Sequence, residues 1–550
     1  MTMRVQHRRV AFRTSLVLLS IGCYSSGTTP EFDASLVADT ATETKPFDPG
    51  PVSMRRLTLE QYRNVIMDLF GGEVVVPDLE DPDLSQGGLL SVGAAETTFS
   101  ARGVSSIEEA ALSIAKQAID DETQRLRWIT CAPTGTKDET CSRTVLARLG
   151  RSAWRRPLLP AEVERLATVA DDAGASLGDF EAGLEYGIAA LLQSPHFMFR
   201  VELGQDDGNG KRRFDAFELA SRLSFFLWNT SPDEALLDRA ADGSLETDEG
   251  LRAEATRLLA SPRARDGLRS FFSDQLQLYR LDTVTKDPTL FEQWSTELGP
   301  DAREETLLLL LDLVLDRAGD FRDIMTTTRT ALNSRLAALY GVPAPTQTGF
   351  RLVDMPADSK RAGLLTHASI LNTYAHQVST SATRRGRFVR TVLLCQTIPI
   401  PPVEVDTSIP EPSGTALTLR DRVKEHLEEA SCAGCHNAMD PIGLGLENYD
   451  AIGRLRTEDN GATIDPSGDL DGAPFDDAAG LGSAIRNHAA FAPCMVKTLV
   501  RYANGRVEAP TEEAAIGDLA DRFADLGYRL QPMLLEIVMS PLFRTAGEPR

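Results

Sequence analysis

The sequence predicts a mainly α-helical protein built from several helical modules. Apolar residues recur at helical spacing through most of the chain, for example in residues 57–70 and 214–228. Strand patterns are sparse, and no glycine-rich phosphate-binding loop follows a strand. A doubly wound α/β enzyme is therefore not expected.

The N-terminus is typical of an export signal. Residues 1–22 combine four arginines, no acidic residue and an apolar run at 16–22 that is too short to span a bilayer. Cys23 follows a small residue and opens a polar stretch, as in a bacterial lipoprotein, although Ser20 stands where leucine is commoner. We expect a lipidated Cys23, membrane attachment by this lipid only, and a location in the periplasm or at the cell surface as an outer-membrane lipoprotein. Plain secretion is the alternative.

The composition predicts a globular protein that does not bind nucleic acid. The 550 residues are 42% hydrophobic and 25% charged, with a net charge of −23. Loss of the four arginines of the signal takes the net charge to −27, which would repel nucleic-acid phosphates. This length corresponds to about three or four domains.

One motif in the chain indicates a specific chemistry. Cys432, Cys435 and His436 form the Cys-x-x-Cys-His pattern of covalent haem c attachment. The two thiols would bond one edge of the haem, and the imidazole of His436 would be the proximal iron ligand. The alternatives are half of a zinc site, although no second ligand pair follows, or a redox Cys-x-x-Cys.

The sixth iron ligand is less well defined by the sequence. Met495 is the distal candidate, and Met533, Met539 and His488 are also downstream of the motif. Met439 follows His436 too closely to cross the haem. A methionine in the sixth position suits electron transfer, whereas an open position permits ligand or peroxide chemistry.

Four cysteines remain when Cys23 and the haem cysteines are set aside. The simplest pairing is Cys131 with Cys141, which closes a short polar loop, and Cys395 with Cys494, which joins distant segments. Four cysteines allow three connectivities, so this pairing is one hypothesis among three. Disulfides of this kind persist in an oxidising compartment and agree with export.

These observations divide the chain into segments. After the signal peptide (1–22) we expect a disordered tether (23–51), an N-terminal helical module (52–130) and a second helical module (131–205). A central helical module (211–345), a cytochrome-c-like haem module (355–475) and a C-terminal helical module packed on it (476–550) follow.

Two segments of the chain resemble each other. In both, an arginine precedes an acidic helix and then an apolar helix that ends in Ser-Pro-x-Phe: Arg156 through 194–197, and Arg506 through 540–543. Proline fixes the exit turn in each copy. The pattern indicates a repeated helix pair, which is either an ancient duplication or two similar helix stops.

Three stretches around the haem motif have a predicted role. The basic residues 384–387 either steer haem propionates or an acidic partner, or form a solvated turn. Pro441 is expected to orient His436 through its neighbouring carbonyls. Residues 459–477, rich in Asp and Gly, predict a surface loop and lack the order of an EF-hand.

Several motifs together match a known type of protein. They are Arg56-Leu57-Thr58 with Gln61-Tyr62, Arg155-Arg156-Pro157-Leu158, Ser194-Pro195-His196-Phe197, residues 219–228, Gly363-Leu364-Leu365-Thr366 with Arg385-Gly386, Cys432 to His436, Asp440-Pro441-Ile442-Gly443-Leu444, Glu447-Asn448-Tyr449-Asp450, Gly505-Arg506 and Ser540-Pro541. With these, the chain resembles large exported, cytochrome-c-like proteins of planctomycetes and myxobacteria that consist of five consecutive modules of unknown function. The resemblance covers about 54–543. It implies the modular architecture and a haem, but no substrate.

The leading hypothesis is an exported, lipid-anchored haem c protein that passes electrons to or from a redox partner protein. A haem-dependent oxidase or peroxidase of the cell envelope is the first alternative. A structural or binding lipoprotein without haem is the second. No pairing of a base with a nucleophile is visible that would indicate hydrolysis.

Overall fold

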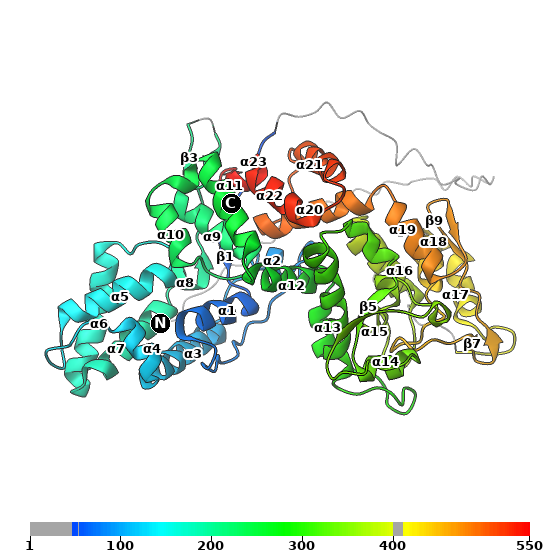
Figure 1. Ribbon diagram of the computed structural model, residues 1–550, viewed down its shortest axis with the longest axis horizontal. Helices are drawn as coiled ribbons and strands as arrows, with labels where there is room; N and C mark the ends of the chain where they lie inside the picture. Colours follow the sequence, from blue (N-terminus) through cyan, green and yellow to red (C-terminus); the bar gives the residue numbers. More distant parts are fainter. Residues whose placement is uncertain (1–46, 53, 209, 400–410, 429, 550) are drawn as a thin grey trace, which may run out of the picture. The chain divides into compact units, whose positions relative to one another are not determined.

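In the described part of the chain, helices predominate and the short strands form two- and three-stranded sheets, which confirms the prediction of a mainly helical fold (Figure 1). The computed structural model describes residues 47–52, 54–208, 210–399, 411–428 and 430–549, with the backbone alone at 425, 426, 430 and 431. The predicted signal peptide and Cys23 lie outside the described residues. In the described part, no helix has the length and apolar character needed to cross a membrane.

The first repeat begins and ends with strands that pair. β1 (Arg55–Arg56) lies antiparallel to β2 (Phe199–Arg200). Thr58 and Gln61 form a capping box at the start of α1. The helices between the two strands are α1 (Leu59–Phe70), α2 (Leu90–Gly93), α3 (Ala101–Asp120), α4 (Glu122–Trp128), α5 (Glu139–Ala153), α6 (Pro160–Leu177), α7 (Phe180–Leu192) and α8 (Pro195–Met198).

The second repeat has the same elements at its two ends. β4 (Arg212–Arg213) pairs antiparallel with β3 (Gln205–Asp206) and with β11 (Thr545–Ala546). Asp215 and Glu218 form the capping box of the helix that follows β4. The corresponding helices are α9 (Ala216–Leu227), α20 (Phe491–Asn504), α21 (Glu513–Asp525), α22 (Leu530–Met539) and α23 (Pro541–Arg544).

An arginine–glutamate pair has the same geometry in both repeats. The guanidinium of Arg156 donates to both oxygens of Glu162 at 2.8 and 2.9 Å, and Arg506 donates likewise to Glu512 at 2.5 and 2.6 Å. In each copy the same carboxylate also accepts a backbone N–H three residues before it, at 2.7 Å. The residue before each arginine has a φ of 61°. The two segments therefore agree in more than the Ser-Pro-x-Phe sequences that end their helices, and this favours duplication.

The segment between α9 and α20 is an insertion in the second repeat. Its helices begin with α10 (Glu234–Ala241), η2 (Ser244–Glu246), α11 (Asp248–Ala260), α12 (Arg263–Gln275), η3 (Leu278–Asp282), α13 (Leu298–Leu311), η4 (Asp312–Asp316), η5 (Phe321–Met325) and α14 (Ser334–Tyr340). They continue with η6 (Ala357–Ser359), η7 (Leu364–Thr366), α15 (Ala368–Thr373), α16 (Ala382–Phe388), η8 (Val389–Leu393), α17 (Leu419–Glu428), α18 (Ala430–Leu444) and α19 (Ala478–Asn487).

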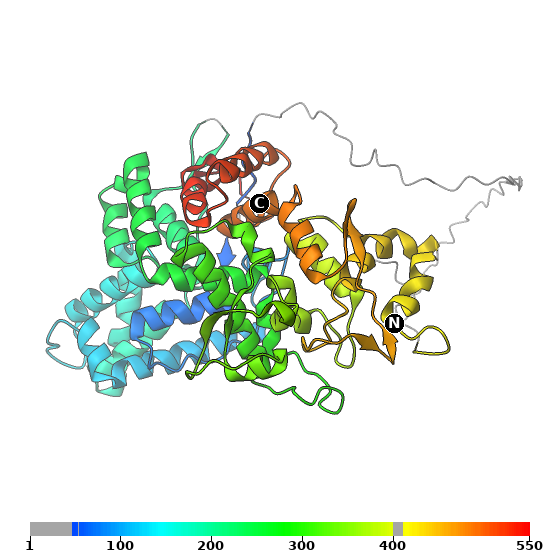
Figure 2. The ribbon, with the colours of Figure 1, turned by 45° about the vertical axis from the view of Figure 1, so that its right-hand side comes forward.

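Three two-stranded antiparallel sheets complete the insertion. β5 (Arg329–Leu332) pairs with β6 (Arg351–Asp354), β7 (Glu458–Asp459) with β8 (Ala462–Thr463), and β9 (Gly468–Leu470) with β10 (Ala473–Phe475). The last two lie within residues 459–477 and its immediate surroundings, so the predicted surface loop is partly structured. In Figure 2 these orange hairpins lie beside the yellow helices α17 and α18, and β9 contacts α18.

The hydrophobic cores cut across the expected module boundaries. One core draws residues from 57 to 198 and Phe225, so the predicted modules 52–130 and 131–205 share a single interior. The largest core draws residues from 89 to 543 and so joins the central, haem and C-terminal modules. Tertiary packing thus unites segments that composition alone separates.

A buried ionic cluster lies where the repeats meet. Glu202 accepts from Arg55 at 2.5 Å, Arg200 at 2.7 Å and Arg222 at 3.2 Å. Burial would raise the pKa of Glu202, but the three arginines outweigh this and hold it well below its usual range. Arg55 is the first residue of β1 and Arg222 belongs to α9, so the cluster links both repeats.

Candidate functional site

The haem motif lies inside a helix. Cys432, Cys435 and His436 belong to α18, which contacts both α16 and α17. Positions i, i+3 and i+4 lie on one side of an α-helix, so the two sulfurs and the imidazole share a side of α18. All three side chains are half-buried. α18 continues past the motif to Leu444, and its later residues pack against α16.

His436 is held by a carboxylate of its own helix. Its Nδ1 lies 2.8 Å from Oδ2 of Asp440, and the hydroxyl of Thr383 on α16 donates to Oδ1 of Asp440 at 2.8 Å. Asp440 is completely buried. Because an ionised carboxylate only accepts, Nδ1 carries the proton and the lone pair of the neutral ring is on Nε2, the nitrogen that would face a metal.

His436 contacts the carboxylate of Asp440, the residue before Pro441. An orienting role for the carbonyls around Pro441 stays a prediction. Pro441 lies within α18 and has no N–H to continue the helical ladder. Asp440 is a functional candidate that the sequence analysis missed. Its signal was the i, i+4 spacing from His436, which became meaningful only once the motif was known to be helical.

Close contact between α16 and α18 fixes the helix that carries the motif. A Cβ on Gly386 would lie 1.9 Å from the carbonyl oxygen of Met439, and one on Gly443 would lie 1.8 Å from that of Ala382. Both positions therefore require glycine. Arg390 adds a hydrogen bond from its Nε to the carbonyl of Ala438 at 2.8 Å.

The turn after α18 is organised around a buried arginine. Arg385, with 0% exposure, donates to the carbonyls of Leu446, Tyr449 and Asp450 at 2.8 to 3.0 Å. Burial lowers the pKa of Arg385 to about 10, which leaves it charged at neutral pH. The predicted role of 384–387 in binding propionates or forming a solvated turn is therefore wrong for Arg385. Its guanidinium donates to backbone carbonyls inside the protein.

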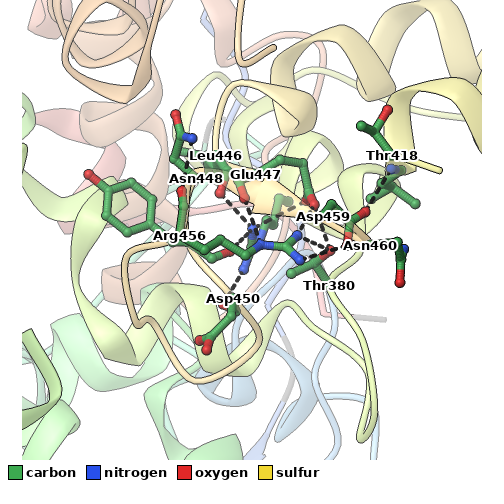
Figure 3. A network of polar contacts seen from close by, with 12 residues as sticks. Thr380, Thr418, Leu446, Glu447, Asn448, Asp450, Arg456, Asp459 and Asn460 are labelled. Atoms are coloured by element: carbon green, nitrogen blue, oxygen red, sulfur yellow. Dashed lines mark hydrogen bonds and ion pairs between the residues drawn. The ribbon is translucent and has the colours of Figure 1, made fainter. Parts of the chain in front are cut away.

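A second arginine joins the same turn to the hairpin that follows (Figure 3). Arg456 donates to the carboxylate of Glu447 at 2.7 Å and to Asp459 at 3.0 Å. Glu447 is buried and also accepts from the hydroxyl of Thr380 at 2.7 Å. This polar network ties the segment after α18 to the segment before α16, so α18 is anchored at its carboxyl end.

The distal candidates are held in other contacts. Met495 and Met533 are buried in the largest core, with 3% and 0% exposure. Met539 packs against the same core. His488 contacts Oδ2 of Asp471 through Nε2 at 3.0 Å. Packing and hydrogen bonding account for these side chains, and the sixth ligand stays a prediction.

The cysteine pairing is confirmed. Cys131 is bonded to Cys141, and Cys395 to Cys494, which selects one of the three connectivities. Cys432 and Cys435 stay outside these disulfides, as haem attachment requires. Among the described residues, no group of three or more His, Cys, Asp or Glu side chains is arranged to hold a bare metal ion.

The donor set fits a haem c. Two thiols outside the disulfides and an imidazole share one side of a helix, and a buried carboxylate sets the tautomer of the imidazole. A partner of this kind is the usual second-shell support of a metal-bound histidine.

Four protein families match consecutive parts of the chain, each described only as a protein of unknown function. They are DUF1595 at residues 141–202, DUF1592 at 214–342, DUF1588 at 361–459 and DUF1585 at 471–543. These matches show four of the consecutive modules of unknown function that the resemblance implied. The haem motif lies in the DUF1588 match. Comparison with curated proteins and with solved structures finds no match.

Proposed function

We propose that this protein is an exported haem c protein that transfers electrons. Cys432 and Cys435 would form the thioether bonds, and His436 would be the proximal ligand. The observation that carries the proposal is the shared side of α18, on which the thiols lie beside an imidazole whose Nδ1 is held by buried Asp440. A bound haem would supply a one-electron iron couple.

The surrounding residues suit a site that must keep its geometry through repeated electron transfer. The glycine contacts of α16 with α18 prevent the motif from shifting along its neighbour. Arg385 and Arg456 hold the following turn. A rigid frame of this kind lowers the rearrangement that accompanies a change of charge, because the surrounding dipoles are already oriented.

A haem-dependent oxidase or peroxidase is the second candidate. The Nδ1 hydrogen bond to a carboxylate increases the electron donation of His436, and this favours chemistry at an open sixth position. Under either reading we propose export, a lipid anchor at Cys23, a location in the periplasm or at the cell surface, and an external redox partner. The two disulfides agree with an oxidising compartment.

The test is covalent haem incorporation. The full chain is expressed in a host with cytochrome c maturation, and the intact mass and the reduced absorption spectrum are recorded. We expect the mass of one haem and a sharp α-band. A Cys432→Ser/Cys435→Ser variant should lose both, while the neighbouring Asn437→Ala variant keeps them.

The outcome also separates the candidates. A far-red band in the oxidised spectrum indicates methionine ligation and favours electron transfer. A five-coordinate spectrum with rapid turnover of peroxide favours the oxidase or peroxidase. A wild-type mass equal to that of the polypeptide and its lipid would refute both haem functions and leave a structural or binding lipoprotein.

A further inference from the structure

The second repeat holds a short extended segment of its own chain. Residues 47–51 were predicted to belong to the disordered tether (23–51), but residues 47–52 pack along β11. Gly50 donates its N–H to Oε1 of Glu512 at 3.1 Å and accepts from the N–H of Gly547 at 2.9 Å. Pro51 forms a parallel bridge with Gly547, and Thr511 donates to the carbonyl of Asp48 at 2.6 Å. The prediction of disorder is wrong for these residues, because the edge of β11 offers them hydrogen bonds.

Glycine at the centre of this segment leaves the space that the guanidinium of Arg506 occupies. A Cβ at Gly50 would lie 2.4 Å from Nη1 of Arg506, the arginine that pairs with Glu512. The backbone therefore runs directly over the ion pair, in van der Waals contact with the guanidinium. Recognition of the segment thus combines a backbone N–H, a backbone carbonyl and the absence of a side chain.

The first repeat contains the same recognition groups. Arg156 and Glu162 correspond to Arg506 and Glu512. When the two Ser-Pro-x-Phe sequences are aligned, Val201 corresponds to Gly547. Successive N–H groups of an antiparallel strand point to opposite sides, and Arg200 pairs with β1, so the N–H of Val201 points away from β1. This is the orientation in which the N–H of Gly547 meets Gly50.

In the first repeat Arg156 and Val201 line a cavity instead of contacting a bound segment, and Oε1 of Glu162 lies 3.5 Å from Nε2 of His196, another residue of the lining. The first-repeat groove has a volume of about 300 Å³, and its lining includes Trp154, Arg156, His196, Val201 and Phe217. The side chain of Arg156 is 30% exposed, against 15% for Arg506 under the segment. Among the described residues, the N–H of Val201 has no hydrogen-bond acceptor.

The groove also has walls suited to proline. His196 lies against Trp154, with ring centroids 4.8 Å apart and ring planes tilted by 40°, and Phe217 lines the same cavity. Aromatic surfaces of this kind bind the rigid rings of extended proline-containing peptides at low entropic cost.

The geometry points to a peptide-binding site: the first-repeat groove takes an extended Pro-Gly-Pro segment of a partner protein, as the second repeat takes residues 49–51. The N–H of Val201 donates to the carbonyl of the peptide glycine, and Glu162 accepts its N–H. Arg156 excludes any larger residue at that position. The site is independent of the haem.

A synthetic peptide with the sequence of residues 46–52 tests this inference. The peptide carries a fluorescent label, and anisotropy is followed during titration with the full mature protein, whose second repeat already holds its own copy. We expect saturable binding of one peptide per chain. The same peptide with Gly50→Val should bind at least tenfold more weakly, because the added side chain meets Arg156.

Protein variants locate the binding. Val201→Pro removes the N–H and should abolish binding, whereas Val201→Ala keeps the N–H and the affinity. Circular dichroism confirms that both variants are folded, and the Gly50→Val peptide supplies a comparison that needs no protein variant. Absence of saturable binding, equal binding of both peptides, or full binding by a folded Val201→Pro protein would overturn the proposal. The last result would mean that the peptide displaces residues 47–52 from the second repeat.

Discussion

Replacement of Glu162 by glutamine should open the helix pair of the first repeat. Glu162 accepts two bonds from Arg156 and one from the backbone N–H of Leu159. The hydrogen bonds from Arg156 are the main reason that the pKa of Glu162 is lowered from 4.5 to about 2. A shift of this size corresponds to about 3.4 kcal/mol. Because the side chain of Arg156 is 30% exposed, solvent screening reduces the expected loss to about 2 kcal/mol.

The pH dependence has a defined sign. The folded protein binds the proton of Glu162 more weakly than the unfolded chain does. The stabilisation is therefore complete above pH 4.5 and is lost as the pH falls through about 2. The difference between wild type and Glu162→Gln should be full at pH 7 and should disappear at the acid end of this range.

Hydrogen exchange of the α6 amides, followed by mass spectrometry, measures this local opening. The matched control is Glu164→Gln, two residues along the same helix, whose carboxylate is exposed and pairs with Arg143. We expect faster exchange in α6 at pH 7 for Glu162→Gln and little change for the control. Equal exchange in the two variants, or a difference that persists at pH 2, would refute the reasoning.

Three further predictions concern the haem helix and its surroundings. Asp440→Asn should raise the reduction potential of the haem proposed at His436 by about 50–100 mV, because part of a charge-assisted hydrogen bond of about 1.5–3 kcal/mol is lost. A redox titration that shows no shift would contradict the role of Asp440. Loss of the Cys395–Cys494 disulfide, whose cysteines are 99 residues apart, should cost about 2–5 kcal/mol. The double alanine variant should melt below the oxidised wild type, and an unchanged melting temperature would contradict this estimate. Gly443→Ala should force α18 away from α16 and lower both the thermal stability and the yield of covalent haem. Gly434→Ala is the control, because a Cβ there meets no atom within 4 Å and should change neither quantity. Equal effects of the two substitutions would show that the close approach of the helices is unimportant.

Local sequence patterns predicted many of the helices closely. The apolar periodicity of residues 57–70 and 214–228 predicted helices there, and α1 and α9 lie within these ranges. Such periodicity depends on neighbours within a few residues, so one sequence contains enough information to place these helices. The two disulfides were also named correctly, although by a choice among three pairings.

Other features depend on residues far apart in the chain. The burial of Arg385 follows from carbonyls about 60 residues later, which no local pattern reveals. Likewise, residues 47–52 are ordered because they meet Gly547 and Glu512 at the other end of the chain. Composition indicated disorder for these residues because proline, glycine and aspartate form few local contacts of their own.

The sequence by itself determined the helical class, the position of the Cys-x-x-Cys-His motif and the existence of two similar helix pairs, because each is carried by residue spacing along one stretch. Only the tertiary structure decided that Asp440 holds His436, that strands close both repeats, and that one repeat encloses a peptide segment while the other presents an open groove. These outcomes depend on which segments, far apart in the chain, pack together and satisfy each other's hydrogen-bonding groups. Residue spacing along the chain does not contain that information.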